Sequence, residues 1–218
     1  MREFAIGVIS SLAATVVAVV VGWLGLSWPR RTLTRLLAKV TGTGLLRVYA
    51  QQKVANIDLA ADLREARWVR VLAPRGNELT RDSFQPLWQG NNEHLESVQV
   101  LLPDLVSRWV YVREQELRQS DPGFEQELLA KQISANIDYL TAVAARNPAV
   151  ALRLFDAPHT GRLVVTDRLV YLTLYVGRGH GRNSPCVVAG KGGLLYEHAL
   201  EQFMLLWRVS SPPAPKPV

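Results

Sequence analysis

The hydrophobic pattern of the chain begins with one long run that contains no charged residue. This run extends from Phe4 to Trp28, and its length of about 25 residues corresponds to about 37 Å of α-helix. The hydrocarbon core of a bilayer is about 30 Å thick, so the run can cross it once with some tilt. The alternatives are a cleaved signal peptide or a buried core helix, whose apolar stretches are usually shorter. We therefore expect a retained transmembrane helix over residues 4–28.

The charges on the two sides of this run predict its orientation. Arg2 and Glu3 precede it, whereas a basic cluster follows it, consisting of Arg30, Arg31, Arg35, Lys39 and Arg47. Lys and Arg remain on the cytoplasmic side of a membrane. We therefore expect a signal-anchor in the bacterial inner (plasma) membrane, with the N-terminus outside and the soluble part in the cytoplasm.

Small residues recur along the apolar run. They are spaced three or four positions apart, which places them on one helix face, and they are Gly7, Ser11, Ala14, Ala18, Gly22 and Gly25. In lipid, small residues allow two helices to pack closely. We expect the bilayer to be one partner and a second copy of the chain to be another, while a helix that stays alone is the alternative.

The next segment, residues 29–66, is predicted to be a basic helical linker. Its first helix has one apolar face, formed by Leu33, Leu36, Leu37 and Val40. That face would lie on the inner membrane surface or dock on the soluble domain, and the pattern leaves both open. A second helix is expected over Leu45–Ala66.

Residues 67–210 alternate between strand-like and helix-like patterns. Strands are expected at Trp68–Leu72, Val98–Leu102, Val150–Phe155, Leu163–Thr166, Leu169–Val176 and Cys186–Ala189. Helices are expected at about Thr80–Trp88, Asp104–Gln119, Phe124–Arg146 and Leu194–Val209. Alternation early and clustered strands late favour one α/β domain with a mixed β-sheet flanked by helices. The proline-rich residues 211–218 are expected to be disordered.

Composition narrows the choice of partners. The net charge is +6, but part of the excess lies beside the predicted membrane segment, where anionic lipids attract it. Nucleic acid is therefore not an expected partner. Cys186 is the only cysteine, which excludes an intrachain disulfide, and the four histidines are scattered without a metal-binding spacing. We predict no metal and no cofactor.

Two glycine-rich loops are candidates for anion binding. Residues 190–193 lack the spacing of a phosphate-binding P-loop. The loop 177–182 combines three glycines with Arg178, His180 and Arg182, which suit an anion. An exposed hairpin tip is the alternative for this loop.

The segment from Thr160 to Asp167 lies between an arginine-bearing strand, ALRLF, and the strand LVYLTLYV. This order resembles the phospholipase D-like superfamily, whose motif is H-x-K-x4-D. The resemblance implies a phospholipase D-like sandwich for the fold. It also implies that Arg162 occupies the position of the phosphate-holding lysine, Asp167 that of the aspartate, and Thr160 that of the nucleophilic histidine.

The departures from this motif bear on activity. Threonine cannot replace histidine as the nucleophile, and the neighbouring His159 would face the other side of a strand. The family pairs two motifs across one site, and this chain has at most one. We therefore predict no catalytic residue, whereas Arg153 and Arg162 could still hold phosphate. Alternatively, Arg162 and Asp167 form an ion pair at the surface or rim.

The sequence thus predicts a single-pass membrane protein with a cytoplasmic, inactive phospholipase D-like domain. It would bind a phosphate-bearing ligand or a protein partner in signalling or defence. The candidate ligand-binding residues are Arg153, Thr160, Arg162, Asp167, Arg178 and Arg182. The alternatives are a membrane-tethered phosphodiesterase whose site is completed by dimerisation, and a scaffold without a small ligand.

Overall fold

The computed structural model describes residue 38 and residues 40–80, 82–88 and 92–214. The predicted transmembrane helix, its small-residue face and most of the predicted amphipathic helix lie outside these residues. Among the described residues, no helix is long and apolar enough to cross a membrane.

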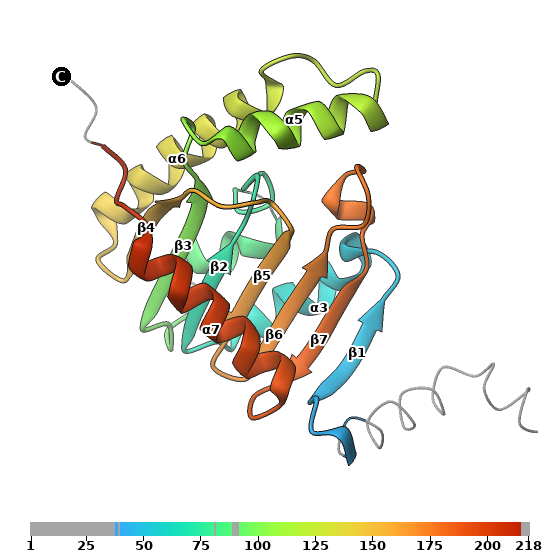
Figure 1. The fold of residues 1–218 in the computed structure, drawn as a ribbon. Coiled ribbons are helices and arrows are strands. Elements are labelled where there is room, and N and C mark those ends of the chain that lie inside the picture. The colour runs from blue at the N-terminus through green and yellow to red at the C-terminus, as the bar shows by residue number, and fades with distance from the viewer. Residues whose placement is uncertain (1–37, 39, 81, 89–91, 215–218) are drawn as a thin grey trace, which may run out of the picture.

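The described residues form one seven-stranded sheet (Figure 1). Its strands are β1 (Leu45–Tyr49), β2 (Trp68–Leu72), β3 (Ser97–Pro103), β4 (Val150–Phe155), β5 (Gly161–Thr166), β6 (Leu169–Leu174) and β7 (Cys186–Gly190). Their spatial order is β1-β7-β6-β5-β2-β3-β4. The ladders β2–β3 and β3–β4 are parallel, and the other neighbours are antiparallel. The predicted mixed sheet is confirmed.

Helices cover both faces of this sheet. They are α3 (Gln52–Arg64), α4 (Gln85–Trp88), α5 (Arg108–Ser120), α6 (Leu128–Arg146) and α7 (Leu194–Val209), with short 3₁₀ turns at Asp82–Phe84 and Gly181–Asn183. α7 crosses one face of the sheet, and α3 lies behind the other (Figure 1). Residues of α6 share the buried core of α3.

Strand β3 explains why both faces are covered. Successive side chains of a strand point to opposite faces. Val98, Val100 and Leu102 belong to the core under α3 and α6, whereas Leu101 packs with Phe203 of α7. The nearly continuous apolar run of this strand therefore reflects burial on two sides.

The helix predicted over Leu45–Ala66 is wrong in its first part. Residues 45–49 form strand β1, which pairs with β7 at the edge of the sheet, and the helix begins at Gln52. An open edge of β7 offers backbone partners that a helical linker would leave unused, so the tertiary context decides this segment. Residues 45–66 consequently belong to the α/β fold and not to a separate linker.

The strands and helices predicted within residues 67–210 are present, with shifted ends. α5 begins at Arg108 because Ser107 caps it, its Oγ accepting a hydrogen bond from the Trp109 N–H at 3.1 Å. The tail predicted to be disordered starts with an ordered residue, since Ser211 exchanges two backbone hydrogen bonds with Leu154 of β4.

The topology brings several chain segments to one end of the sheet. β5 runs antiparallel to β2 and pairs Leu163 with Leu72, so β5 starts where β2 ends. β6 ends at the same place, because Leu174 is opposite Gly161. The carboxyl ends of parallel strands are where ligands usually bind in open α/β sheets.

Candidate functional site

A pocket of about 460 Å³ lies at this end of the sheet. Its size is that of a site for a small molecule. The loop after β2, the loop after α5, the start of β5, the β6–β7 loop and the first residue of α3 contribute to its wall. The charged or titratable side chains among those that line it, apart from Tyr175, are Arg75, Glu78, Asp121, Arg162, His180 and Arg182.

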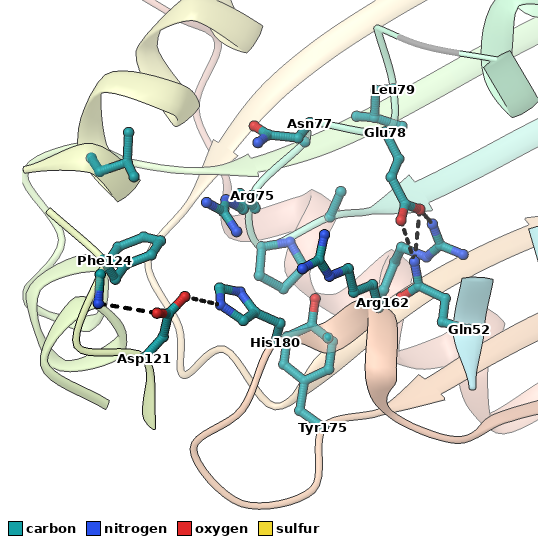
Figure 2. A pocket seen from close by; sticks show the side chains of 17 residues that line it. Gln52, Arg75, Asn77, Glu78, Leu79, Asp121, Phe124, Arg162, Tyr175 and His180 are labelled. Carbon is teal, nitrogen blue, oxygen red and sulfur yellow. Dashed lines mark hydrogen bonds and ion pairs between the residues drawn. The ribbon is translucent and has the colours of Figure 1, made fainter. Parts of the chain in front are cut away.

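Arg162 is the most deeply buried cation of this pocket, with 4% of the residue exposed. Its Nη1 forms an ion pair with Glu78, and its Nη2 donates to Asn56 Oδ1 at 3.3 Å. Gln52 Nε2 donates to both carboxylate oxygens of Glu78, at 2.8 and 2.7 Å (Figure 2). The charged Arg162 and the neutral Gln52 thus both bind the Glu78 carboxylate.

Arg75 approaches the pocket from the loop after β2. Its guanidinium lies over the ring of Phe124, 5.2 Å from the ring centre, and its Nε donates to Gln132 Oε1. Burial lowers the pKa of Arg75, and the positive charges of Arg182 and Arg113 act in the same direction. Cations therefore crowd this part of the wall.

His180 and Asp121 form a third contact in the pocket. His180 Nε2 lies 3.0 Å from Asp121 Oδ2 (Figure 2), and its ring packs at a tilt against Phe124. The hydrogen bond from His180, followed by that from the Gly123 backbone N–H, lowers the pKa of Asp121. This contact joins the β6–β7 loop to the loop after α5.

Two of the six predicted ligand-binding residues line the pocket, namely Arg162 and Arg182. Thr160 is exposed in the loop before β5 and is not part of the lining. Arg178 has an exposed side chain, and its carbonyl accepts a hydrogen bond from Ser120 Oγ at 2.8 Å. The structure thus brings one residue of the H-x-K-x4-D-like segment into the site.

The other two predicted residues lie elsewhere in the fold. Arg153 contacts α7, where its Nη1 donates to the Trp207 carbonyl at 2.8 Å and its guanidinium lies over the Trp207 ring. Asp167 follows the far end of β5 and accepts a hydrogen bond from the Arg67 N–H at 3.0 Å. The alternative ion pair between Arg162 and Asp167 is therefore wrong, because the two residues stand at opposite ends of β5.

His159 also lies outside the pocket, in the loop before β5 rather than on a strand. Its ring packs edge-on against Phe155, and neither ring nitrogen has a hydrogen-bond partner among the described residues. Burial lowers its pKa to about 4, and the charge of Arg113 contributes. His159 therefore contributes nothing to the wall of the pocket.

Sequence reasoning missed Arg75, Glu78, Asp121 and Gln52. Arg75 follows a strand that ends at Leu72, and the carboxyl end of a buried strand could have pointed to it. Glu78 had no local signal, because it meets Arg162 across a separation of 84 residues. Gln52 had none either, because it reaches this pair only by donating to Glu78. In the described part of the chain, no group of residues is suited to hold a metal ion.

No protein-family model and no curated protein matches this chain. Three solved structures are similar to it at low identity. TrmBL2, an archaeal chromatin protein, is 16% identical, with 97% of this chain and 67% of that chain covered and a TM-score of 0.47. Nuc from Salmonella typhimurium, a phospholipase D family member, is 12% identical, with 74% and 91% covered and a TM-score of 0.47. NucT from Helicobacter pylori is 10% identical, with 77% and 98% covered and a TM-score of 0.45. These likenesses are distant, so the function has to be argued from the residues of the chain itself.

Proposed function

We propose that this chain is a single-pass membrane protein whose cytoplasmic domain binds a phosphate-bearing ligand without cleaving it. The domain would be a degenerate relative of the phospholipase D-like superfamily, acting in signalling or defence. The observation that carries the proposal is the pocket wall, in which Arg75, Arg162 and Arg182 surround a cavity large enough for a small molecule.

The charge of the pocket supports an anionic ligand. Three arginines and two carboxylates, Glu78 and Asp121, line it, which leaves one net positive charge when His180 is set aside. Guanidinium groups match phosphate in shape and keep their charge when partly buried. Hydrogen bonds between ionised partners are about twice as strong as those between neutral ones.

We expect no turnover, because the motif position holds no suitable nucleophile. Phosphodiester cleavage through a covalent intermediate needs a nucleophile that also leaves readily. Thr160, at the motif position, is exposed outside the pocket lining, and His159 is half-buried outside it. Binding can therefore persist where catalysis is lost.

A ligand screen tests this proposal on the purified full chain in detergent. The panel consists of methyl phosphate, dimethyl phosphate, adenosine monophosphate and a short DNA oligonucleotide. We expect at least one phosphate compound to raise the melting temperature, since a ligand at 100 times its Kd adds about 2.7 kcal/mol to the native state. Hydrolysis of bis(p-nitrophenyl) phosphate should stay at the background rate. A panel without any stabilising compound contradicts the proposal and favours a scaffold.

A membrane-tethered phosphodiesterase is the second candidate, and the His180–Asp121 contact favours it. An imidazole held by a carboxylate beside arginines has the composition of a phosphoryl-transfer site. Self-association through the small residues of the predicted anchor would bring two such pockets together. Turnover that His180→Asn abolishes, while the exposed control His198→Asn retains it, would establish this candidate.

A further inference from the structure

Arg75 and Arg182 differ from the other arginines around the pocket in their partners. Arg162 pairs with Glu78, and the nearby Arg113 pairs with Glu116 at 2.7 Å. Within the described ranges, neither Arg75 nor Arg182 forms an ion pair with a carboxylate. Both line the pocket, and they are close enough for the charge of Arg182 to disfavour that of Arg75. Besides the hydrogen bond from His180, the charge of Arg182 also lowers the pKa of Asp121, but the Asp121 side chain is bonded to His180 and not to either arginine. Two neighbouring guanidinium groups without an ion-paired carboxylate form a site at which an incoming anion would be stabilised.

Arg162, in contrast, already has a carboxylate partner in the protein, and only its Nε is without a hydrogen-bond partner among the described residues. Its Nη1 is used by Glu78 and its Nη2 by Asn56, and the side chain is 5% exposed. Gln52 holds the Glu78 carboxylate in place through both of its oxygens. A phosphate group that took Arg162 would have to displace this carboxylate and leave it unpaired, which is costly at a buried ion pair.

The loop that carries Arg182 is fastened on the side of α5. Arg113 Nη2 donates to the Gly179 carbonyl at 2.6 Å, and Ser120 Oγ donates to the Arg178 carbonyl at 2.8 Å. The His180–Asp121 contact is the third attachment. A loop that is already ordered in the free protein does not lose conformational entropy on binding. The position of Arg182 is therefore largely set before a ligand binds.

We infer that Arg75 and Arg182 together bind the dianionic phosphoryl group of a phosphomonoester. This inference rests on the proposed function and names the ligand class and the part of the pocket used. A monoester carries close to two negative charges at pH 7, whereas a diester carries one, and two arginines that are not ion-paired with a carboxylate match the former. In Figure 2, Arg75 and the Asp121–His180 contact lie on one side of the view and the Glu78–Arg162 pair on the other. These two carboxylates would repel further phosphates on either side.

The rest of the pocket accommodates the organic part of such a ligand. A cavity of about 460 Å³ is much larger than one phosphoryl group, and its wall includes the apolar residues Pro74, Leu79, Phe124 and Leu128. The monoester could be a soluble metabolite or the headgroup of phosphatidic acid, because both present the same group.

Isothermal titration of the full chain in detergent tests the inference with two matched probes. Methyl phosphate is the monoester, and dimethyl phosphate is the diester. We expect methyl phosphate to bind at least about tenfold more tightly, which corresponds to about 1.4 kcal/mol. Arg75→Gln and Arg182→Gln should each weaken methyl phosphate about tenfold. The matched control is Arg178→Gln, an exposed arginine of the same loop outside the lining, which should leave the affinity unchanged.

The outcomes separate this inference from the proposed function. If dimethyl phosphate binds as tightly as methyl phosphate, or if both glutamine variants bind like the wild type, the inference is overturned while phosphate binding stands. If no phosphate compound of the larger panel binds, the proposed function fails as well. Arg182 is exposed, so Arg182→Gln should fold normally. If Arg75→Gln does not fold, the affinity of Arg182→Gln for methyl phosphate tests the inference by itself.

A nanodisc experiment identifies the source of the monoester. The full chain is placed in discs of phosphatidylcholine with or without phosphatidic acid, and methyl phosphate is titrated. Weaker binding only in discs with phosphatidic acid supports the same arginine pair with a lipid headgroup as its ligand. Equal binding in both discs supports the pair with a soluble ligand, and an absence of binding in both overturns the inference.

Discussion

At the scale of single residues, the pocket contains a buried cation whose partner is a carboxylate of the protein itself. Arg162 was predicted to hold phosphate, yet the protein supplies its own carboxylate, Glu78, to this cation. A buried arginine needs such a partner, because an unpaired buried charge is strongly destabilising. Part of this pocket therefore maintains the fold, and another part is free for a ligand.

The Glu78–Arg162 pair gives the first prediction. Glu78→Ala should destabilise the protein by about 1–3 kcal/mol, because Arg162 would keep one weak amide contact in a buried position. The control is Glu96→Ala, which removes the exposed ion pair with Arg67 and should cost less than about 1 kcal/mol. Thermal unfolding of both variants measures the difference. Equal losses would show that the pocket pair has no structural role.

His159 gives a prediction for the pH dependence of stability. Its pKa falls from 6.5 to about 4 on folding, so the unfolded chain binds this proton first as the pH drops. The stabilising effect of the neutral imidazole is complete above pH 6.5 and is lost as the pH falls towards 4. His159→Leu should remove about 1–3 kcal/mol of this pH dependence, and His198→Leu, at an exposed site, should not. Unfolding midpoints at pH 7 and pH 4.5 test it, and unchanged slopes in His159→Leu would contradict the assignment.

At the scale of elements, β1 shows the limit of reading helices and strands from local pattern. Arg47 on β1 pairs with Asp58 of α3 at 2.7 Å and with Asp62 at 3.2 Å, and the strand completes the sheet beside β7. α3 follows β1 directly in the chain, whereas the paired strand β7 lies far from β1 in sequence. The parallel strands and α7 were predictable because their apolar runs and flanking prolines or glycines are strong local signals.

The contact between Gly44 and Gly193 gives a prediction for this edge of the sheet. A Cβ on Gly193 would lie inside van der Waals contact of the Gly44 backbone, so backbone would have to move. Gly193 has φ −88°, which alanine tolerates, so the cost would come from the contact alone. Gly193→Ala should lower the free energy of unfolding by about 1–3 kcal/mol. Gly179→Ala, at a site with open space, is the control, and equal melting temperatures of the two variants would refute the prediction.

At the scale of the whole molecule, the predicted anchor and the α/β domain make separate contributions. The basic residues that follow the uncharged run predict an N-terminus outside the cell and a domain inside. The pocket would then bind soluble ligands of the cytoplasm or lipid headgroups of the inner leaflet.

Topology gives the last prediction. Protease added to intact cells should leave the domain undigested, whereas protease added to lysed cells should degrade it. A variant with Arg30, Arg31 and Arg35 changed to Ser weakens the charge bias, and part of the domain should then become accessible from outside. Digestion of the wild-type domain in intact cells would reverse the orientation.

The sequence by itself determined the α/β class and the position of most strands and the last helix, and it named Arg162 and Arg182 as candidate ligand-binding residues. These follow from local periodicity, strand-ending residues and charge, which act over a few positions. Tertiary structure alone decided that Leu45–Tyr49 form a strand and that Asp167 and Arg153 lie away from the pocket. It also decided that Glu78 and Asp121 enter the pocket. The physical reason is that sheet order and side-chain pairing join segments that lie far apart in the chain, such as Leu45 and Ala189, and no local pattern encodes which partners meet.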